Sequence, residues 1–410
     1  MTVKAILVGA GQRGLLSYAP YALQKPQELT FVGVAEPDGE RRNTFKQEHH
    51  IAPENAYSSW EEILDRPKFA DAVLICTNDR MHFEPTMKAL AQGYHVLLEK
   101  PMSYDANELK AMDEEARKRG LILSVCHVLR YTEFFSELKR ILDEGKIGTL
   151  VSIQHLESVG YWHQAHSFVR GNWRRKDETS PMILAKCCHD MDILNFLVGG
   201  KCVSVASFGS LRHFKHENRP EGAPDRCILG CPHADTCPYD ATRLYLGEST
   251  DWPTSAISND TSMDARIKVL KEGPYGRCVY ACDNDVVDNQ VVNLLYDNGV
   301  TVSMGMCAFT KEIKRTITLM GTYGQITGDM EENIIHVDDF VSGKRETVEI
   351  NPRGGGHSGG DYGLMKDFVR QVASNGQYKG LTSSEVSIQS HLMALAAEES
   401  RLTGKIIEMI

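Results

Sequence analysis

Three glycines near the start of the chain have types and spacing suited to binding a dinucleotide. They follow a short apolar run in the pattern Gly9-x-Gly11-x-x-Gly14. The first glycine permits a tight turn, the second lets a pyrophosphate approach the backbone, and the third lets a helix pack closely on the strand. Free N–H groups at the start of that helix favour negative charge. The pattern predicts a cofactor loop consisting of Gly9, Gly11, Gln12, Arg13 and Gly14.

Glu36 ends the next apolar run, about 20 residues after Gly14, where a carboxylate binds the ribose 2′-hydroxyl of NAD. The same carboxylate would repel the 2′-phosphate of NADP. The sequence therefore favours NAD. Arg41 and Arg42 could instead accommodate a phosphate, and an ordinary solvated acid at a strand end is the structural alternative.

Two further segments, TNDRMH at 77–82 and HVLLEKP at 95–101, carry polar residues at predicted strand ends. Together with the glycine loop they resemble the Gfo/Idh/MocA family, named for glucose–fructose oxidoreductase and inositol dehydrogenase. The likeness covers the chain apart from residues 208–285. It implies that Lys100 lies between nicotinamide and a substrate hydroxyl, where an ammonium stabilises developing negative charge. It also implies cofactor contacts at Thr77, Asn78, His82, Glu99 and Lys100.

The family's second catalytic element is D-x-x-x-H on a helix, and here it aligns with a segment ending at His189. Ala185 replaces the aspartate. Because histidine titrates in the useful range, His189 is the expected acid/base for the hydroxyl proton, and a buried core histidine is the alternative. Asp192, on the same helical face, is expected either to orient His189 or to form a structural pair. Lys186 is a candidate to hold a substrate hydroxyl or carboxylate.

Residues 161–174 combine aromatic rings with hydrogen-bonding groups, which suits the apolar faces and hydroxyls of a carbohydrate. Arginines there would also suit a carboxylate or sulfonate on the sugar. The glycine-rich loop 354–361 resembles family loops near the substrate. The predicted substrate contacts are therefore Tyr161, His163, Arg170, Trp173, Lys186 and His357.

A cysteine cluster lies within the segment 208–285, which is rich in proline, glycine, aspartate and cysteine. Cys227, Cys231, Cys237 and His233 fall within eleven residues and could hold zinc in a closed site. Free thiols, or one disulfide formed on handling, are the alternatives. A bound zinc would be structural, because the hydride chemistry implied by the resemblance needs no metal.

The alternation of short apolar runs with helical patterns over the first 126 residues predicts a Rossmann-type, doubly wound parallel sheet. Residues 127–410 are expected to form an α/β substrate and oligomerisation domain with a large, mostly antiparallel open sheet, interrupted by an insertion at about 208–285. Strands are predicted at 3–8, 29–35, 70–76, 96–98, 121–126, 148–157, 286–295, 300–307 and 315–320. Helices are predicted at 83–92, 106–118, 134–144, 182–197 and 383–403, the last packing back on the first domain.

The composition of the chain limits the kinds of partner that it can bind. Its 410 residues carry a net charge of −10, which argues against nucleic acid because phosphate binding needs a basic face. No stretch reaches the ~18 apolar residues of a membrane span. Eleven cysteines, an odd number, favour reduced thiols and a cytoplasmic location. The resemblance implies a homodimer or homotetramer formed through the open sheet.

These observations together predict a cytoplasmic NAD-dependent oxidoreductase acting on a hydroxyl of a sugar or polyol. Two alternatives stay open. One is an NAD-dependent glycosidase that works by transient oxidation, elimination and re-reduction, which the Ala185-Lys186 departure leaves possible. The other is a non-catalytic NAD-binding regulator, because a fold does not prove activity.

Overall fold

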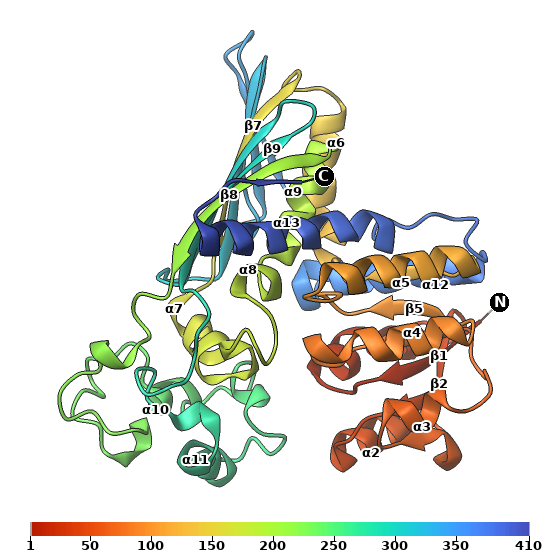
Figure 1. Ribbon diagram of the computed structural model, residues 1–410, viewed down its shortest axis with the longest axis vertical. Helices are drawn as coiled ribbons and strands as arrows, with labels where there is room; N and C mark the ends of the chain where they lie inside the picture. The colour runs from red at the N-terminus through yellow and green to blue at the C-terminus, as the bar shows by residue number, and fades with distance from the viewer. Residues whose placement is uncertain (1, 410) are drawn as a thin grey trace.

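The computed structural model describes residues 2–409 and contains two β-sheets, with an insertion lobe below the second (Figure 1). The first sheet is parallel, with the order β3-β2-β1-β4-β5-β6. The strand order reverses between β1 and β4, where sheets of this kind bind their ligands. Its strands are β1 (Val3–Val8), β2 (Leu29–Ala35), β3 (Ala56–Tyr57), β4 (Ala72–Ile75), β5 (His95–Leu98) and β6 (Leu123–Val125).

Both faces of this sheet are buried, as its continuously apolar strands predict. Along β1, Ala5 and Leu7 face one hydrophobic cluster, while Ile6 and Val8 face the other. The helices that surround this sheet are η1 (Gln12–Tyr18), α1 (Pro20–Gln24), α2 (Gly39–Glu48), α3 (Trp60–Leu64), α4 (Phe83–Ala91) and α5 (Ala106–Arg119).

The helix α12 (Gly360–Ala373), from late in the chain, also packs on the first sheet. Its buried Leu364, Phe368 and Val372 lie in the same cluster as Leu7. From the sequence, only the last helix was expected to pack back on the first domain. The structure shows that α12 packs there as well. It brings the preceding loop, which carries His357, to the side of the glycine loop.

The second sheet has nine strands in the order β14-β13-β12-β11-β7-β10-β9-β8-β15, and only β7 and β10 run parallel. Strand β9 alternates buried and exposed residues, so one face of the sheet is covered and the other open. This confirms the predicted fold class. The strands are β7 (Leu150–Ser158), β8 (Cys202–Ser210), β9 (Asn289–Tyr296), β10 (Thr301–Cys307), β11 (Lys314–Gly321), β12 (Gly324–Asp329), β13 (Ile334–Asp339), β14 (Arg345–Glu349) and β15 (Ile407–Glu408).

The helices α6 (Glu133–Asp143) and α9 (Cys188–Val198) contribute to the hydrophobic core beneath the covered face. The predicted helix at 182–197 is in fact two, because α8 (Met182–Ala185) ends before Lys186 and α9 begins after Cys187. The break leaves the carbonyl of Ala185 without a helical partner. The long helix α13 (Ser384–Thr403) packs against α5 of the first domain and against α9 and β8 of the second (Figure 1).

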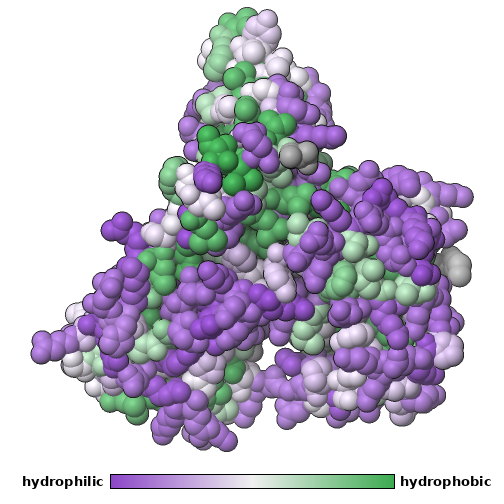
Figure 2. Space-filling model, in the orientation of Figure 1, coloured by the Kyte–Doolittle hydropathy of each residue, from purple (hydrophilic) through white to green (hydrophobic). Residues whose placement is uncertain are grey.

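The insertion forms a separate lobe with small hydrophobic clusters and the helices α10 (Ala241–Tyr245) and α11 (Met263–Glu272). Figure 2 shows a hollow between this lobe and the first domain. The two meet where Asn259 donates a hydrogen bond to Glu40 on α2. No helix among residues 2–409 is both long enough and apolar enough to cross a membrane.

Candidate active site

The glycine loop has the geometry that a pyrophosphate needs. Gly9 has a φ of +91°, and a Cβ there would lie 2.6 Å from the carbonyl oxygen of Cys76. A Cβ on Gly14 would lie 2.2 Å from the oxygen of Gly9, so neither position tolerates a side chain. A Cβ on Gly11 would meet no atom within 4 Å. The loop is therefore closed on its protein side and open at Gly11, where a phosphate would approach.

Glu36 is buried against this loop. Its Oε2 accepts a hydrogen bond of 2.7 Å from the backbone N–H of Ala10, and its Oε1 accepts one of 2.9 Å from Arg41. Arg42 is directed to the main-chain oxygen of Glu36. Because Arg41 is already paired with the carboxylate, the site fits an unphosphorylated ribose better than a 2′-phosphate.

Arg13 and Glu99, both predicted as cofactor contacts, lie in one internal network. Arg13 Nε donates to Glu99 at 2.7 Å, and Arg13 Nη2 pairs with Asp361 at 2.8 Å. Glu99 also accepts from Tyr18 and from the backbone N–H of Lys100. Burial opposes ionisation of Glu99, but Arg13 and Lys100 outweigh it and hold its pKa below the ordinary value. The network thus fixes the glycine loop to the segment that carries Lys100.

His82 is buried, and both of its ring nitrogens face main-chain oxygens. Nδ1 lies 2.7 Å from the oxygen of Pro101, and Nε2 lies 3.1 Å from that of Thr77. Neither ring nitrogen is left to contact the cofactor directly. His82 instead connects the segment at Thr77 with the segment at Pro101. The Thr77 hydroxyl donates to the oxygen of Met81, and Asn78 precedes the short helix η3 (Asp79–Met81).

Asp79 is a site residue that sequence reasoning missed. Its carboxylate accepts hydrogen bonds from Trp173 Nε1 at 3.2 Å and from the Ser180 hydroxyl at 2.8 Å. Trp173, predicted to contact substrate, therefore contacts the first domain. The sequence could have indicated Asp79, because it is an acidic residue that directly follows the predicted cofactor contacts Thr77 and Asn78 at a strand end.

Lys100 and His189 come together across the domain boundary. Lys100 Nζ donates a hydrogen bond of 2.9 Å to the carbonyl oxygen of Ala185, four residues before His189. The buried His189 lies in the first turn of α9, and its Nδ1 has no hydrogen-bond partner. Burial, and then the charge of Lys100, lower the pKa of His189 well below its ordinary value. His189 is therefore a neutral imidazole beside an ammonium.

The His357 ring is centred 5.8 Å from the His189 ring. Its Nδ1 lies 3.2 Å from Asp361, and its backbone φ of +48° reflects the tight glycine-rich loop. The structure therefore places His357 beside the pair formed by Lys100 and His189.

Asp192 does not face His189. Its two carboxylate oxygens each accept a hydrogen bond of 2.7 Å from the buried Arg130. This corrects the catalytic assignment in favour of the structural alternative. Helical spacing placed Asp192 on the correct face, but it could not reveal a partner from another element.

Lys186 belongs to a buried charge cluster that sequence reasoning did not anticipate. Its Nζ lies 3.0 Å from Glu157, and Arg315 lies 2.9 Å from Glu157 and 3.0 Å from Asp190. His155 Nε2 lies 2.8 Å from the same Asp190. Glu157 and Asp190 thus share Arg315, and the pairing with Glu157 holds Lys186 in place.

Of the remaining substrate candidates, Tyr161 and His163 stand at the end of β7. His163 Nδ1 faces the oxygen of Val159 at 3.1 Å, and burial followed by the charge of Lys186 lowers its pKa well below the ordinary value. Its ring contacts Trp252, with centroids 5.1 Å apart. Trp252 lies in the insertion, where the sequence has no clear helical or strand periodicity. The sequence therefore did not indicate that Trp252 reaches this site.

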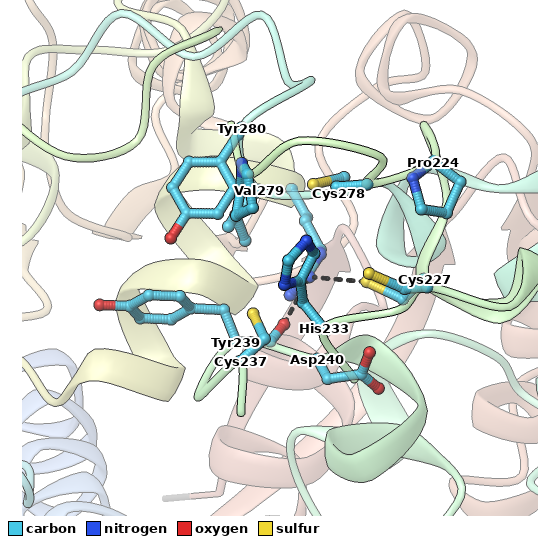
Figure 3. Close-up of a pocket in the computed structure, with 13 residues that line it drawn as sticks. Pro224, Cys227, His233, Cys237, Tyr239, Asp240, Cys278, Val279 and Tyr280 are labelled. Carbon is cyan, nitrogen blue, oxygen red and sulfur yellow. Dashed lines mark hydrogen bonds between the residues drawn. The ribbon is translucent and has the colours of Figure 1, made fainter. Parts of the chain in front are cut away.

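Arg170 is not part of this site. It is fully buried, donates to the main-chain oxygens of Arg277 and Tyr239, and contacts Cys227 Sγ at 3.7 Å. The structure thus places this predicted substrate contact inside the insertion, where its side chain connects several segments. Figure 3 shows the small pocket that it helps to line.

The zinc prediction is not supported. Cys227, Cys231, Cys237 and His233 all line this pocket, as does Cys278 (Figure 3). His233 Nε2, however, faces the main-chain oxygen of Glu221 at 2.8 Å. Within residues 2–409 no group of three or more histidine, cysteine, aspartate or glutamate side chains could hold a metal ion. The cysteines are free thiols, which was the stated alternative.

Family models match nearly all of the chain. Residues 3–127 match the "Oxidoreductase family, NAD-binding Rossmann fold" model of Gfo/Idh/MocA, and residues 139–408 match the "Oxidoreductase family, C-terminal alpha/beta domain" model. YteT of Bacillus subtilis (strain 168) is 24% identical over 366 residues, which are 85% of this chain and 83% of YteT. The scyllo-inositol 2-dehydrogenase (NADP(+)) IolW of the same organism is 32% identical over 120 residues, only 29% of this chain and 32% of that enzyme.

Solved structures share the fold over the whole chain. Levoglucosan dehydrogenase in complex with NADH and levoglucosan has a TM-score of 0.74 at 19% identity, covering 100% of this chain and 99% of that one. An oxidoreductase from Agrobacterium radiobacter, in complex with NAD+, L-tartaric acid and magnesium, has a TM-score of 0.72 at 15% identity, covering 100% and 98%. At these identities the likeness establishes the fold alone.

Proposed function

The chain belongs to the Gfo/Idh/MocA family of NAD-binding oxidoreductases, and we propose that it transfers a hydride between a secondary hydroxyl of a sugar or polyol and the nicotinamide of NAD. The observation that carries the proposal is the approach of Lys100 Nζ to Ala185 O at 2.9 Å, which puts the ammonium beside His189. IolW, by its name, acts on an inositol, and levoglucosan dehydrogenase was solved with levoglucosan.

The residues present fit the cofactor. Gly11 is open to a pyrophosphate, and Glu36 directly follows β2, where a carboxylate would bind a ribose hydroxyl. When bound, NAD supplies the hydride acceptor. The contacts we propose for it are Gly9, Gly11, Gln12, Gly14, Glu36, Thr77, Asn78 and Lys100, with Arg13, His82 and Glu99 supporting the loops that make them.

In the proposed reaction the carbon–hydrogen bond at the hydroxyl-bearing carbon breaks, and its electron pair leaves with the hydride. His189 accepts the hydroxyl proton as the carbonyl group forms, because its pKa is lowered and its Nδ1 is unpartnered. Lys100 donates to the reacting oxygen and stabilises the negative charge that develops there. Tyr161, His163, Lys186 and His357 complete the proposed substrate contacts.

The open face of the nine-stranded sheet supports a homo-oligomer. Leu156, Phe208, Val291 and Leu295 are exposed on strands of this sheet. Exposed apolar patches of this kind are typical of protein interfaces. We also infer a cytoplasmic location, which the eleven free cysteines favour.

A screen of pyranosides, inositols and uronates with NAD tests the reaction. The expected result is the formation of NADH with at least one compound, together with the matching ketone. Aryl glycosides should be included, with release of the aglycone followed in parallel. Aglycone release without NADH would instead identify the redox-neutral glycosidase, and cofactor binding without any turnover would overturn both enzymatic proposals.

A further inference from the structure

Three carboxylates on the elements around His189 are paired with protein cations. Glu157 and Asp190 are fully buried and share Arg315, with Lys186 and His155 as their other partners. Asp192 is held by Arg130. Ala185 stands where the family motif has an aspartate. Both carboxylates of the described segment 182–198, Asp190 and Asp192, are thus buried in ion pairs and are not exposed to a substrate.

Two ammonium groups remain on the substrate side. Lys186 pairs with one carboxylate oxygen and keeps 15% of its side chain exposed, and Lys100 donates to a single carbonyl. An ammonium has three donors, so each lysine retains hydrogen-bonding capacity. The histidine next to them, His163, is held neutral by burial and by Lys186, because both lower its pKa. The charged groups on this side are thus two ammonium ions, beside neutral imidazole rings that can accept a hydrogen bond.

A ring hydroxyl both donates and accepts a hydrogen bond, whereas an ionised carboxylate only accepts. A carboxylate pairs with an ammonium through a charge-assisted hydrogen bond and the attraction of opposite charges, which a neutral hydroxyl lacks. We propose that the substrate is a sugar acid and that its carboxylate binds the ammonium of Lys186. The proposal rests on the function proposed above and narrows its substrate class.

The fixed position of Lys186 gives this assignment its specificity. Glu157 lies behind the ammonium at 3.0 Å and is itself anchored by Arg315 at 2.9 Å, so the lysine is held in place before a ligand arrives. The arginines that sequence reasoning offered for an acidic group are not available. Arg170 is buried in the insertion, and Arg174 pairs with Asp283 at 2.9 Å.

The test compares matched sugars that differ only in the acid group: glucuronate with glucose, and galacturonate with galactose, each with NAD. For the wild-type protein the expected kcat/KM is at least tenfold higher for one acid than for its neutral partner. NADH formation with neutral sugars and no preference for an acid would overturn this inference while leaving the proposed function standing. No NADH with any compound, although NAD binds, would overturn both.

Variants then assign the preference to Lys186. In Lys186→Met the KM for the acid should rise about 10- to 100-fold, as for loss of a charge-assisted hydrogen bond, and by a clearly larger factor than the KM for the neutral sugar. Lys186→Arg should keep the preference. The double variant Glu157→Gln/Lys186→Met removes both partners and should lose the preference without leaving an unpaired charge at this pair. Lys146→Met, which breaks a surface pair with Glu346, is the matched control. Equal losses for acid and neutral sugar in Lys186→Met would contradict the assignment.

Discussion

Lys100 and Ala185 join the two domains at the centre of the candidate site, through a 2.9 Å hydrogen bond from the ammonium to a main-chain carbonyl. The carbonyl is available because α8 ends at Ala185 and α9 starts only after Cys187. A main-chain oxygen therefore contacts Lys100 at the position where the family motif has an aspartate. It is neutral, so it orients the lysine without adding a negative charge to the site.

This geometry predicts that Lys100→Met will lower kcat by about 10²- to 10³-fold, the usual cost of removing a group that stabilises developing charge. Methionine keeps the length and apolar stem of lysine but cannot donate a hydrogen bond. The Kd for NAD, measured by fluorescence titration, should rise much less than kcat falls, because the other proposed contacts to NAD remain. A similar loss in Lys110→Met, whose side chain lies on α5 away from the site, would show that the effect is not specific to Lys100.

His189→Asn should lower kcat by about 10²- to 10⁴-fold, since proton transfer would lose its acceptor. Burial, and then Lys100, lower the pKa of His189, so the imidazole is neutral at pH 7 and becomes protonated only in more acidic solution. Oxidation by the wild-type protein should therefore fall as the pH drops through this lowered pKa. The pH profile of the residual activity in the variant should not show this fall at low pH. If the fall is unchanged in the variant, it belongs to another titrating group.

Sequence reasoning predicted that Lys100 and His189 come together, because each lies in a short motif beside a strand or a helix, and the structure brings the two side chains together. It found β1 and β2 to the residue because both are uninterrupted, buried strands. It failed where the deciding partner is distant in the chain. Asp192 pairs with Arg130, and Arg170 meets the oxygen of Arg277. A helical period identifies a face but not the group opposite it.

Asp192→Asn should therefore act on stability rather than on chemistry. It leaves Arg130, which is buried, without its carboxylate, and breaking a buried pair typically costs about 3–5 kcal/mol. Denaturant unfolding measures this loss, while the KM for sugar and the pH profile at low temperature should stay close to wild type. A loss of kcat at undiminished stability would restore the catalytic reading of Asp192.

Glu36→Ala should shift cofactor preference toward NADP. The variant removes the carboxylate that would repel a 2′-phosphate and frees Arg41, now 2.9 Å from Glu36, to bind one. The ratio of NADP to NAD affinity should rise about 10- to 100-fold, the range of one charge-assisted hydrogen bond. Glu40→Ala, on the helix α2 that also carries Arg41, is the control. An unchanged ratio of NADP to NAD affinity in Glu36→Ala would show that Glu36 does not recognise the ribose.

His391 gives a pH-dependent contribution to stability. It is fully buried, its Nε2 accepts from the backbone N–H of Met102 at 2.9 Å, and its Nδ1 faces the oxygen of Ser387 at 2.8 Å. Only the neutral ring can make this pair of contacts. Burial is the largest cause that lowers its pKa, to about 3, followed by the nearby charge of His127.

A folded-state pKa of about 3 lies below the ordinary value of 6.5, so the unfolded chain binds the proton more readily. The stability that His391 contributes is therefore complete above pH 6.5 and is lost as the pH falls, at a rate of about 1.4 kcal/mol per pH unit. Lys100 favours the neutral ring and Asp192 opposes it, but burial outweighs both. Between pH 7 and pH 5 the free energy of unfolding should fall by about 2 kcal/mol less in His391→Gln than in the wild-type protein. Glutamine preserves an acceptor and a donor but does not titrate, so equal slopes for the two proteins in urea unfolding would contradict this assignment.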